Sequence, residues 1–180
     1  MLRKWLTRLA AKNEGFRNFL ARGLMSNDQG VVRTAKIADV AHLEFYLELG
    51  GDPNAVDDKG FSALFYATGK GSTSCVQTLL EAGAGPDMPL PRSTTPLQVA
   101  ARVNNCELVK LLLDGGSNID KSTSHGLTPL MVAVAPGNRE AVELLLERGA
   151  DATKRNKDGD TAETLAETQG FHDVARLLKR

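Results

Sequence analysis

The residues of this sequence that could perform catalysis or hold a metal are scattered along it. None of the three histidines, His42, His125 and His172, has a second histidine or a cysteine at the spacing of metal ligands. The two cysteines, Cys75 and Cys106, form no CxxC pair, so we expect neither a zinc site nor a disulfide framework. The pattern predicts structural places for these side chains and suits a reducing compartment.

Acidic residues and glycines are more numerous, and both have a structural explanation. Glu140, Glu143 and Glu147 share the solvent side of an expected helix, where carboxylates favour solubility over acid and base catalysis. The chain contains neither a GxxxxGKS/T string nor a GxGxxG string after a strand, so no phosphate-binding loop is expected. The sequence therefore predicts a protein without catalytic residues, cofactor or metal, which is not an enzyme.

The glycines belong to a pattern that recurs every 33 residues. The string TPLQVAARVNN at 95–105 returns as TPLMVAVAPGN at 128–138. The same triplet position holds Ser62-Ala63-Leu64 and Thr161-Ala162-Glu163. Glycines keep the spacing at Gly50, Gly83, Gly116 and Gly149, and at Gly60, Gly126 and Gly159, with Ser93 as the exception. A fixed period of this length indicates one structural unit stacked several times.

Each unit is expected to contain two short helices and an extended loop. Thr or Ser at the start of the triplet suits a helix N-cap, and Pro after it suits the first turn. In the copy that starts at Thr128, the first helix should end at Pro136-Gly137 after about two turns. A second, amphipathic helix should run from Arg139 to Arg148 and end at Gly149. The polar residues that follow are typical of a turn-containing loop.

The pattern GxTPLxxA, an aliphatic second helix and GADxN together resemble the ankyrin repeat family. The resemblance is clearest at 93–120 and 126–151 and covers about 150 of the 180 residues. It implies an all-α, ankyrin-like solenoid of about five helix-turn-helix repeats with extended loop fingers. A repeat domain at 26–180 would contain copies at about 27–55, 56–88, 89–121, 122–154 and 155–180.

The two end copies depart from the pattern. The first copy has Gln29-Gly30-Val31 in place of the triplet, so its first helix is expected to be the weakest and to fray first unless other residues cover it. The last copy has Glu163 where the other copies have a buried leucine, and it ends in Lys179-Arg180. Such changes are expected of an end repeat, which must expose one face to water.

Residues 1–25 are predicted to form a basic amphipathic helical segment that precedes the repeats. The segment holds six Lys or Arg and one acid. Its apolar residues recur at spacings of three, four and seven, which places them largely on one side of a helix or helix pair with a break at Gly15. They are Leu2, Trp5, Leu6, Leu9, Phe16, Phe19 and Leu20.

Three interpretations of this segment remain open. It could be a lid on the degenerate first repeat, an attachment to an anionic membrane surface through its basic residues and Trp5, or a separate docking or targeting helix. No apolar run approaches the roughly 18 residues of a spanning helix, and no signal-peptide hydrophobic region is present. We expect a cytoplasmic protein, with peripheral membrane attachment as the alternative.

The resemblance implies a non-catalytic protein-protein interaction module, such as an adaptor, inhibitor or immunity-like partner, that is a monomer when free. A membrane-peripheral scaffold is the alternative. The balance of charges argues against a nucleic-acid partner. In this family the loop tips and the exposed side of the first helices hold the partner. The matching positions here are Asp58, Lys59, Phe61, Phe65, Tyr66, Lys70, Arg92, Thr94, Arg102, Val103, His125, Leu127, Lys157 and Asp160.

Phe61, with Leu127 across the expected groove, is the most informative of these positions. An apolar side chain at a loop tip is expected to be poorly sheltered by its own repeat, and aromatic anchors ringed by Arg are typical of binding centres. The alternative is that Phe61 folds back onto the neighbouring loop. Phe65 and Tyr66 stand where the family usually has His and a variable residue, and they would add aromatic contacts.

Overall fold

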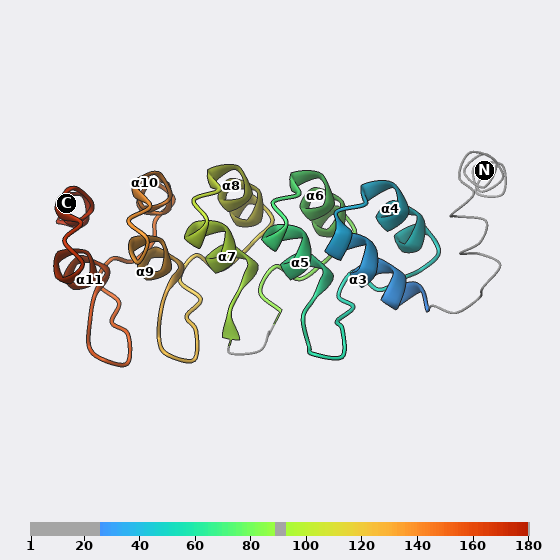
Figure 1. The fold of residues 1–180 in the computed structure, drawn as a ribbon, viewed down its shortest axis with the longest axis horizontal. Coiled ribbons are helices and arrows are strands. Elements are labelled where there is room, and N and C mark those ends of the chain that lie inside the picture. The colour runs from blue at the N-terminus through green and yellow to red at the C-terminus, as the bar shows by residue number, and fades with distance from the viewer. Residues whose placement is uncertain (1–25, 89–92, 180) are drawn as a thin grey trace.

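The computed structural model describes residues 26–88 and 93–179, which form a linear stack of five helix pairs (Figure 1). The first helices of the pairs are α3 (Asn27–Ile37), α5 (Ala63–Gly69), α7 (Pro96–Arg102), α9 (Pro129–Val134) and α11 (Ala162–Thr168). The second helices are α4 (Val40–Glu48), α6 (Thr73–Glu81), α8 (Cys106–Asp114), α10 (Arg139–Glu147) and α12 (His172–Leu178). These ranges contain no strand, so the predicted all-α solenoid is confirmed.

The first helices form one row and the second helices form another, and the loop fingers extend beyond the first row (Figure 1). Each helix packs against its own partner and against the equivalent helix of the next repeat. The architecture is therefore one-dimensional, because each repeat is held only by its neighbours. Residues far apart in the sequence come together only where fingers and first helices of adjacent repeats meet.

The first helices begin where the triplets predict. The side-chain oxygens of Ser62, Thr95, Thr128 and Thr161 each accept a hydrogen bond from the amide three residues further on. Second helices have caps as well, because Asp39, Ser72 and Asn105 do the same for α4, α6 and α8. A capped start of this kind stabilises a helix by about 1 kcal/mol, which matters for helices of two turns.

The first repeat forms its first helix although it lacks the triplet. Helix α3 contains 11 residues and α5 only 7, because in the 33-residue register α3 begins three residues earlier and ends one residue later. Gln29 occupies the triplet's capping place, and Ser26, three residues before it, takes over by accepting the Gln29 amide at 3.2 Å. Val31 still fills the buried leucine position of the other copies. Whether this repeat frays first stays a prediction.

The core is a continuous aliphatic seam with few aromatic residues. Leu97 and Leu130 of the first helices are fully buried, and Leu112 and Leu145 of the second helices are buried in the same register. Fully buried alanines recur in the first helices at Ala67, Ala100, Ala133 and Ala166. Because each layer repeats the one before it, burial of these side chains fixes the 33-residue register.

A ladder of side chains ties each finger base to the next repeat. Asn54, Asp87 and Asp120 stand 33 residues apart, and each accepts a hydrogen bond from a backbone amide 31 residues further on. The donors are the amides of Gly85, Asn118 and Asp151, at 2.7, 2.7 and 3.1 Å. We call these three contacts the ladder. They set the spacing of neighbouring fingers directly, without relying on the core.

Every left-handed residue in the two described ranges falls on one of three 33-residue series. One series follows the second helices at Gly50, Gly83, Gly116 and Gly149; a second lies in the fingers at Gly60, Ser93, Gly126 and Gly159. The third joins the two helices of each pair at Ala38, Gly71, Asn104, Gly137 and Gly170. Ser93, the exception in the sequence pattern, keeps the same backbone with φ 56°. Geometry is therefore conserved between the copies even where glycine is not.

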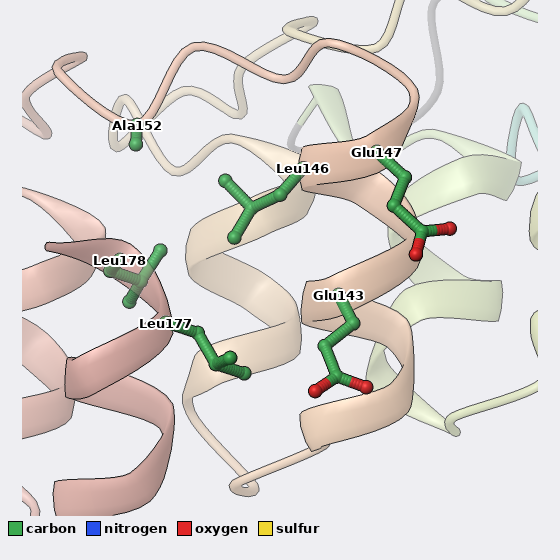
Figure 2. A pocket seen from close by; sticks show the side chains of 6 residues that line it. All are labelled: Glu143, Leu146, Glu147, Ala152, Leu177 and Leu178. Carbon is green, nitrogen blue, oxygen red and sulfur yellow. The ribbon is translucent and has the colours of Figure 1, made fainter. Parts of the chain in front are cut away.

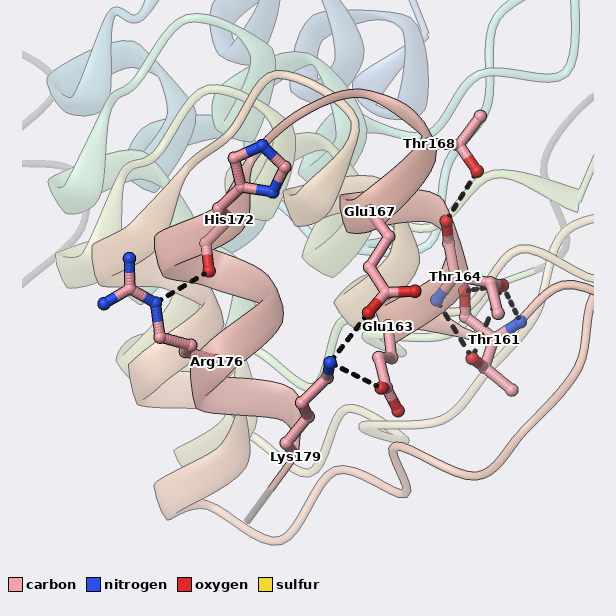
Figure 3. Close-up of polar contacts among 8 residues, drawn as sticks. All are labelled: Thr161, Glu163, Thr164, Glu167, Thr168, His172, Arg176 and Lys179. Atoms are coloured by element: carbon pink, nitrogen blue, oxygen red, sulfur yellow. Dashed lines mark hydrogen bonds and ion pairs between the residues drawn. The ribbon is translucent and has the colours of Figure 1, made fainter.

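The last repeat ends the stack with charged and polar contacts (Figure 3). Thr161 and Thr164 exchange reciprocal side-chain and backbone hydrogen bonds at the start of α11. Lys179 lies 2.8 Å from Glu167 and 3.7 Å from Glu163, so the glutamate at the leucine position is paired at the surface. This arrangement fits the expectation that the end repeat exposes one face to water.

Replacing Ala38, which has φ 58°, with glycine should stabilise the protein. Relief of left-handed strain outweighs the extra chain entropy of glycine, for a net gain of about 0.5–1 kcal/mol. The matched control is Ala41→Gly, an exposed position inside α4, where the same change should cost about 0.5–1 kcal/mol. Urea unfolding measures both, and loss of stability in both variants would contradict the assignment.

Candidate functional site: a groove between the loop fingers and the first helices

In three of the fingers, one polar side chain near the start of the finger holds its tip. Asp57, Thr123 and Asn156 fall on one 33-residue series, and in each a single oxygen accepts the amides two and four residues further on. The amides held in this way are those of Lys59 and Phe61, His125 and Leu127, and Asp158 and Asp160. These three tips, which carry most of the predicted tip contacts, are therefore built as fixed turns.

Three aromatic rings cluster on the second repeat. Phe61, at the finger tip, stacks on Phe65 of α5 with ring centroids 4.9 Å apart and an interplanar angle of 25°. Tyr66 meets both rings edge-on at 6.0 Å. Phe61 is half-buried, so its own repeat shelters it better than the sequence led us to expect. The cluster presents aromatic surface to the groove while resting on rings behind it.

The edge of the aromatic cluster is fixed by a charged network. The Tyr66 hydroxyl donates to Asp57 at 2.6 Å, and Lys36 lies 3.8 Å from Asp57 and 4.4 Å from the centre of the Tyr66 ring. Burial alone would raise the pKa of Asp57, but hydrogen bonds from Tyr66, Phe61 and Lys59 and the charge of Lys36 hold it below its usual value. Asp57 is thus an ionised anchor of the finger.

The groove extends across the second, third and fourth repeats, with a volume of about 600 Å³. One wall is the stacked pair Phe61 and Phe65, and the other contains Leu127 and His125. Arg102 lies at the end of α7 between them. The remaining lining residues are Thr94, Gln98, Val99, Thr123 and Val132. None of the described residues that line this groove is a carboxylate, so this lining combines an apolar surface with a cationic one.

The buried amide of Gln98 links the floor of the groove to the far wall. Its side chain is 1% exposed, and its nitrogen donates to the carbonyls of Lys121 and Leu127 at 2.8 and 3.0 Å. The oxygen accepts the Thr95 amide at 3.0 Å and completes a capping box. Because Gln98 holds the backbone of Leu127, the far wall is fixed relative to α7.

Six of the predicted contact residues come together in this groove. They are Phe61, Phe65, Thr94, Arg102, His125 and Leu127. Others lie elsewhere on the surface: Asp58, Lys59, Lys70 and Lys157 are exposed, Asp160 is half-buried on the last finger, and Tyr66 lies behind the aromatic wall. Val103 is 57% exposed at the end of α7. Their role in binding stays a prediction.

Some predicted contact residues lie outside the described ranges. Arg92 falls between the two ranges, and the seven apolar residues of 1–25 precede them. The three interpretations of residues 1–25 therefore stay predictions.

Sequence reasoning missed four lining residues and the residues that position them. Gln98 stands at the repeat position of Phe65, and Val99 and Val132 share the next position along the chain. Carrying the predicted contact at Phe65 to the other copies, and then to the next residue, would have found all three. Thr123 and Asp57 also share a register. Each is a polar residue four places before a predicted tip contact, and this spacing in the sequence could have identified the turn that the side chain holds.

The residues considered for other chemistry have structural partners. His42 lies 2.6 Å from Asp39 at the start of α4. Burial raises the pKa of the Cys75 thiol, and likewise that of Cys106, which disfavours the reactive thiolate. Within 26–88 and 93–179, no group of three or more His, Cys, Asp or Glu side chains is placed to hold a metal ion. No helix in those ranges is long and apolar enough to cross a membrane.

A second hollow, of about 400 Å³, lies between α10 and α12 (Figure 2). Leu146, Leu177 and Leu178 form its apolar part, and Glu143 and Glu147 stand at its rim. Glu143 is already paired with Arg139 at 2.8 Å. This hollow is smaller than the groove and includes no aromatic residue and no tip residue, so the groove is the better candidate for recognition.

The comparison with protein families agrees with the geometry. The family model described as Ankyrin repeats (3 copies) matches residues 32–123, 77–156 and 97–180. This chain therefore belongs to the ankyrin repeat family. Ankyrin repeats are generally protein-protein interaction modules and typically non-catalytic. A search among curated proteins found no match to the chain.

Replacing Asp57 with alanine should destabilise the protein by about 1 kcal/mol, because two tip amides and the Tyr66 hydroxyl lose their acceptor. The pKa of Asp57 is lowered by folding, so this contribution is complete above the unfolded pKa and disappears as pH falls through the folded pKa. Urea unfolding of wild type and variant should therefore differ fully at neutral pH, and the difference should begin to shrink as pH falls below about 4, toward the lowered pKa of folded Asp57.

The matched control for this prediction is Asp58→Ala, which removes the adjacent exposed carboxylate. It should change the free energy of unfolding by less than about 0.5 kcal/mol at either pH. A difference between wild type and Asp57→Ala that stays constant from pH 7 to pH 3 would contradict the assigned role of the ionised carboxylate.

Proposed function

We propose that this protein is a non-catalytic binding module, acting as an adaptor, inhibitor or immunity-like partner, which holds another protein in the groove between its fingers and first helices. The proposal rests chiefly on one observation. The groove brings together Phe61, Phe65, Leu127, His125 and Arg102 from three successive repeats. Aromatic and arginine side chains at the centre of a concave surface are typical of binding hot spots.

The rigidity of the groove supports this proposal. Asp57 and Thr123 hold the finger tips, and Gln98 ties the far wall to α7. A surface that is already ordered loses little conformational entropy when a partner binds. The openness of the groove fits a protein segment better than a small molecule, which is normally enclosed on most sides.

The competing proposal is a membrane-peripheral scaffold attached through residues 1–25. The observation in its favour is the sequence of that segment, which combines six Lys or Arg with a row of apolar residues that includes Trp5. The two proposals are compatible in principle, because the segment and the groove are separate parts of the chain. Only the groove is supported by contacts in the described residues.

Affinity capture from a lysate of the source cells, with quantitative mass spectrometry, tests the proposed face. The bait variants are wild type, Phe61→Ala/Arg102→Ala in the groove, and Glu147→Ala at the rim of the second hollow as matched control. We expect at least one protein to be captured equally by wild type and control and about tenfold less by the groove variant, because both substitutions remove central contacts. Equal capture by all three baits would refute the choice of face.

A further inference from the structure

The charges of this protein are divided between its two helix rows. Helices α4, α6, α8 and α10 contain eight acidic residues and two basic ones. The first helices that face them, α3, α5, α7 and α9, contain one acidic residue and three basic ones. Over the first four repeats these helices give an acidic back and a mildly basic front, whereas α11 of the end repeat adds two acids, Glu163 and Glu167, that do not line the groove. The groove lies on the basic front, which favours the approach of a negatively charged segment.

Within the groove, Arg102 is the residue that would attract a negatively charged segment. Among the described residues, no carboxylate lies within ion-pair distance of its guanidinium. By contrast, Arg139 and Arg148, on the back, are each paired with an acid. The acid that contacts the aromatic cluster, Asp57, is already bound to Tyr66 and Lys36. Arg102 is therefore available to a carboxylate that a partner brings, and a guanidinium can bind such a group with two parallel hydrogen bonds.

The apolar part of the groove defines a second requirement. Phe61 and Phe65 offer stacked rings on one wall, and Leu127 faces the groove from the other. Val99 and Val132 complete the apolar lining. A groove of about 600 Å³ has room for one or two large side chains of a peptide. An aliphatic or aromatic side chain would gain the most there, because it removes ring and methyl surface from water.

We propose that the groove recognises an acidic peptide segment in which a large apolar side chain lies next to an aspartate or glutamate. The apolar side chain packs between the Phe61–Phe65 stack and Leu127, and the carboxylate binds Arg102. This inference rests on the proposed function, because it names the chemistry of the partner at that same groove. It also argues against the chain's own basic segment, residues 1–25, as the occupant, since like charges would meet at Arg102.

The test is selection from a random 12-residue peptide display library on the full chain, followed by fluorescence anisotropy with the best labelled peptide. We expect the selected peptides to combine Leu, Phe, Met or Trp with neighbouring Asp or Glu. Binding should weaken about tenfold in Arg102→Glu and about tenfold in Phe61→Ala/Phe65→Ala, and it should weaken with added salt. The matched control is Lys110→Glu, an exposed basic residue on the other helix of the same repeat, which should change the Kd less than twofold.

A charge-swapped peptide distinguishes recognition from a loss of folding. The selected peptide with its acids replaced by Lys should bind Arg102→Glu more tightly than it binds wild type, which a merely unfolded variant could not do. Selected peptides that are basic or neutral, yet sensitive to Phe61→Ala/Phe65→Ala, would overturn the acidic partner and leave the groove in place. Peptides indifferent to both groove variants, or no selected peptides at all, would overturn the groove as well.

Discussion

The structure depends on the fixed register between consecutive repeats. No repeat of this size can bury both faces of its helices alone, so each layer is completed by the leucines and alanines of the next. The ladder of Asn54, Asp87 and Asp120 adds a directional constraint, because a hydrogen bond to a defined amide allows only one offset between neighbouring fingers. The groove is a consequence of this offset, since its walls come from three different repeats.

The helices and their order could be predicted because their causes are local. Thr or Ser with Pro at the first turn, glycine after the second helix and the 33-residue period are all legible in the sequence. The first helix of the first repeat was the exception. The period pointed to Gln29, but a capping serine one turn earlier decided where the helix begins. The start of this helix is therefore set by its capping serine and not by the 33-residue period.

The site could be predicted only in part, because its geometry depends on contacts between repeats. The family pattern identified the face and six of the lining residues, including Phe61 and Arg102. It could not show that Phe61 stacks on Phe65, since that depends on how the tip turns around Asp57. It also gave no sign that Gln98 reaches the backbone of the next finger. Such links depend on which residue stands at a repeat position, and the residue at one position differs chemically from copy to copy.

These differences between copies distinguish the proposed binding surface from the repeated frame. The repeated residues build the same frame each time, whereas the tip and first-helix positions change from Phe to Thr to Leu and from Phe to Gln to Met. Variation on a constant frame lets one surface combine an aromatic wall, a cation and an aliphatic wall without altering the fold.

Amide hydrogen exchange by NMR at Gly85, Asn118 and Asp151 tests the fixed register most directly, because these are the ladder's donors. The register predicts that all three exchange far more slowly than unstructured peptide amides. It also predicts that Asp120→Ala accelerates exchange chiefly at Asp151, its own donor. If the three amides of the wild-type protein exchanged as fast as unstructured peptide amides, the fixed register between repeats would be contradicted.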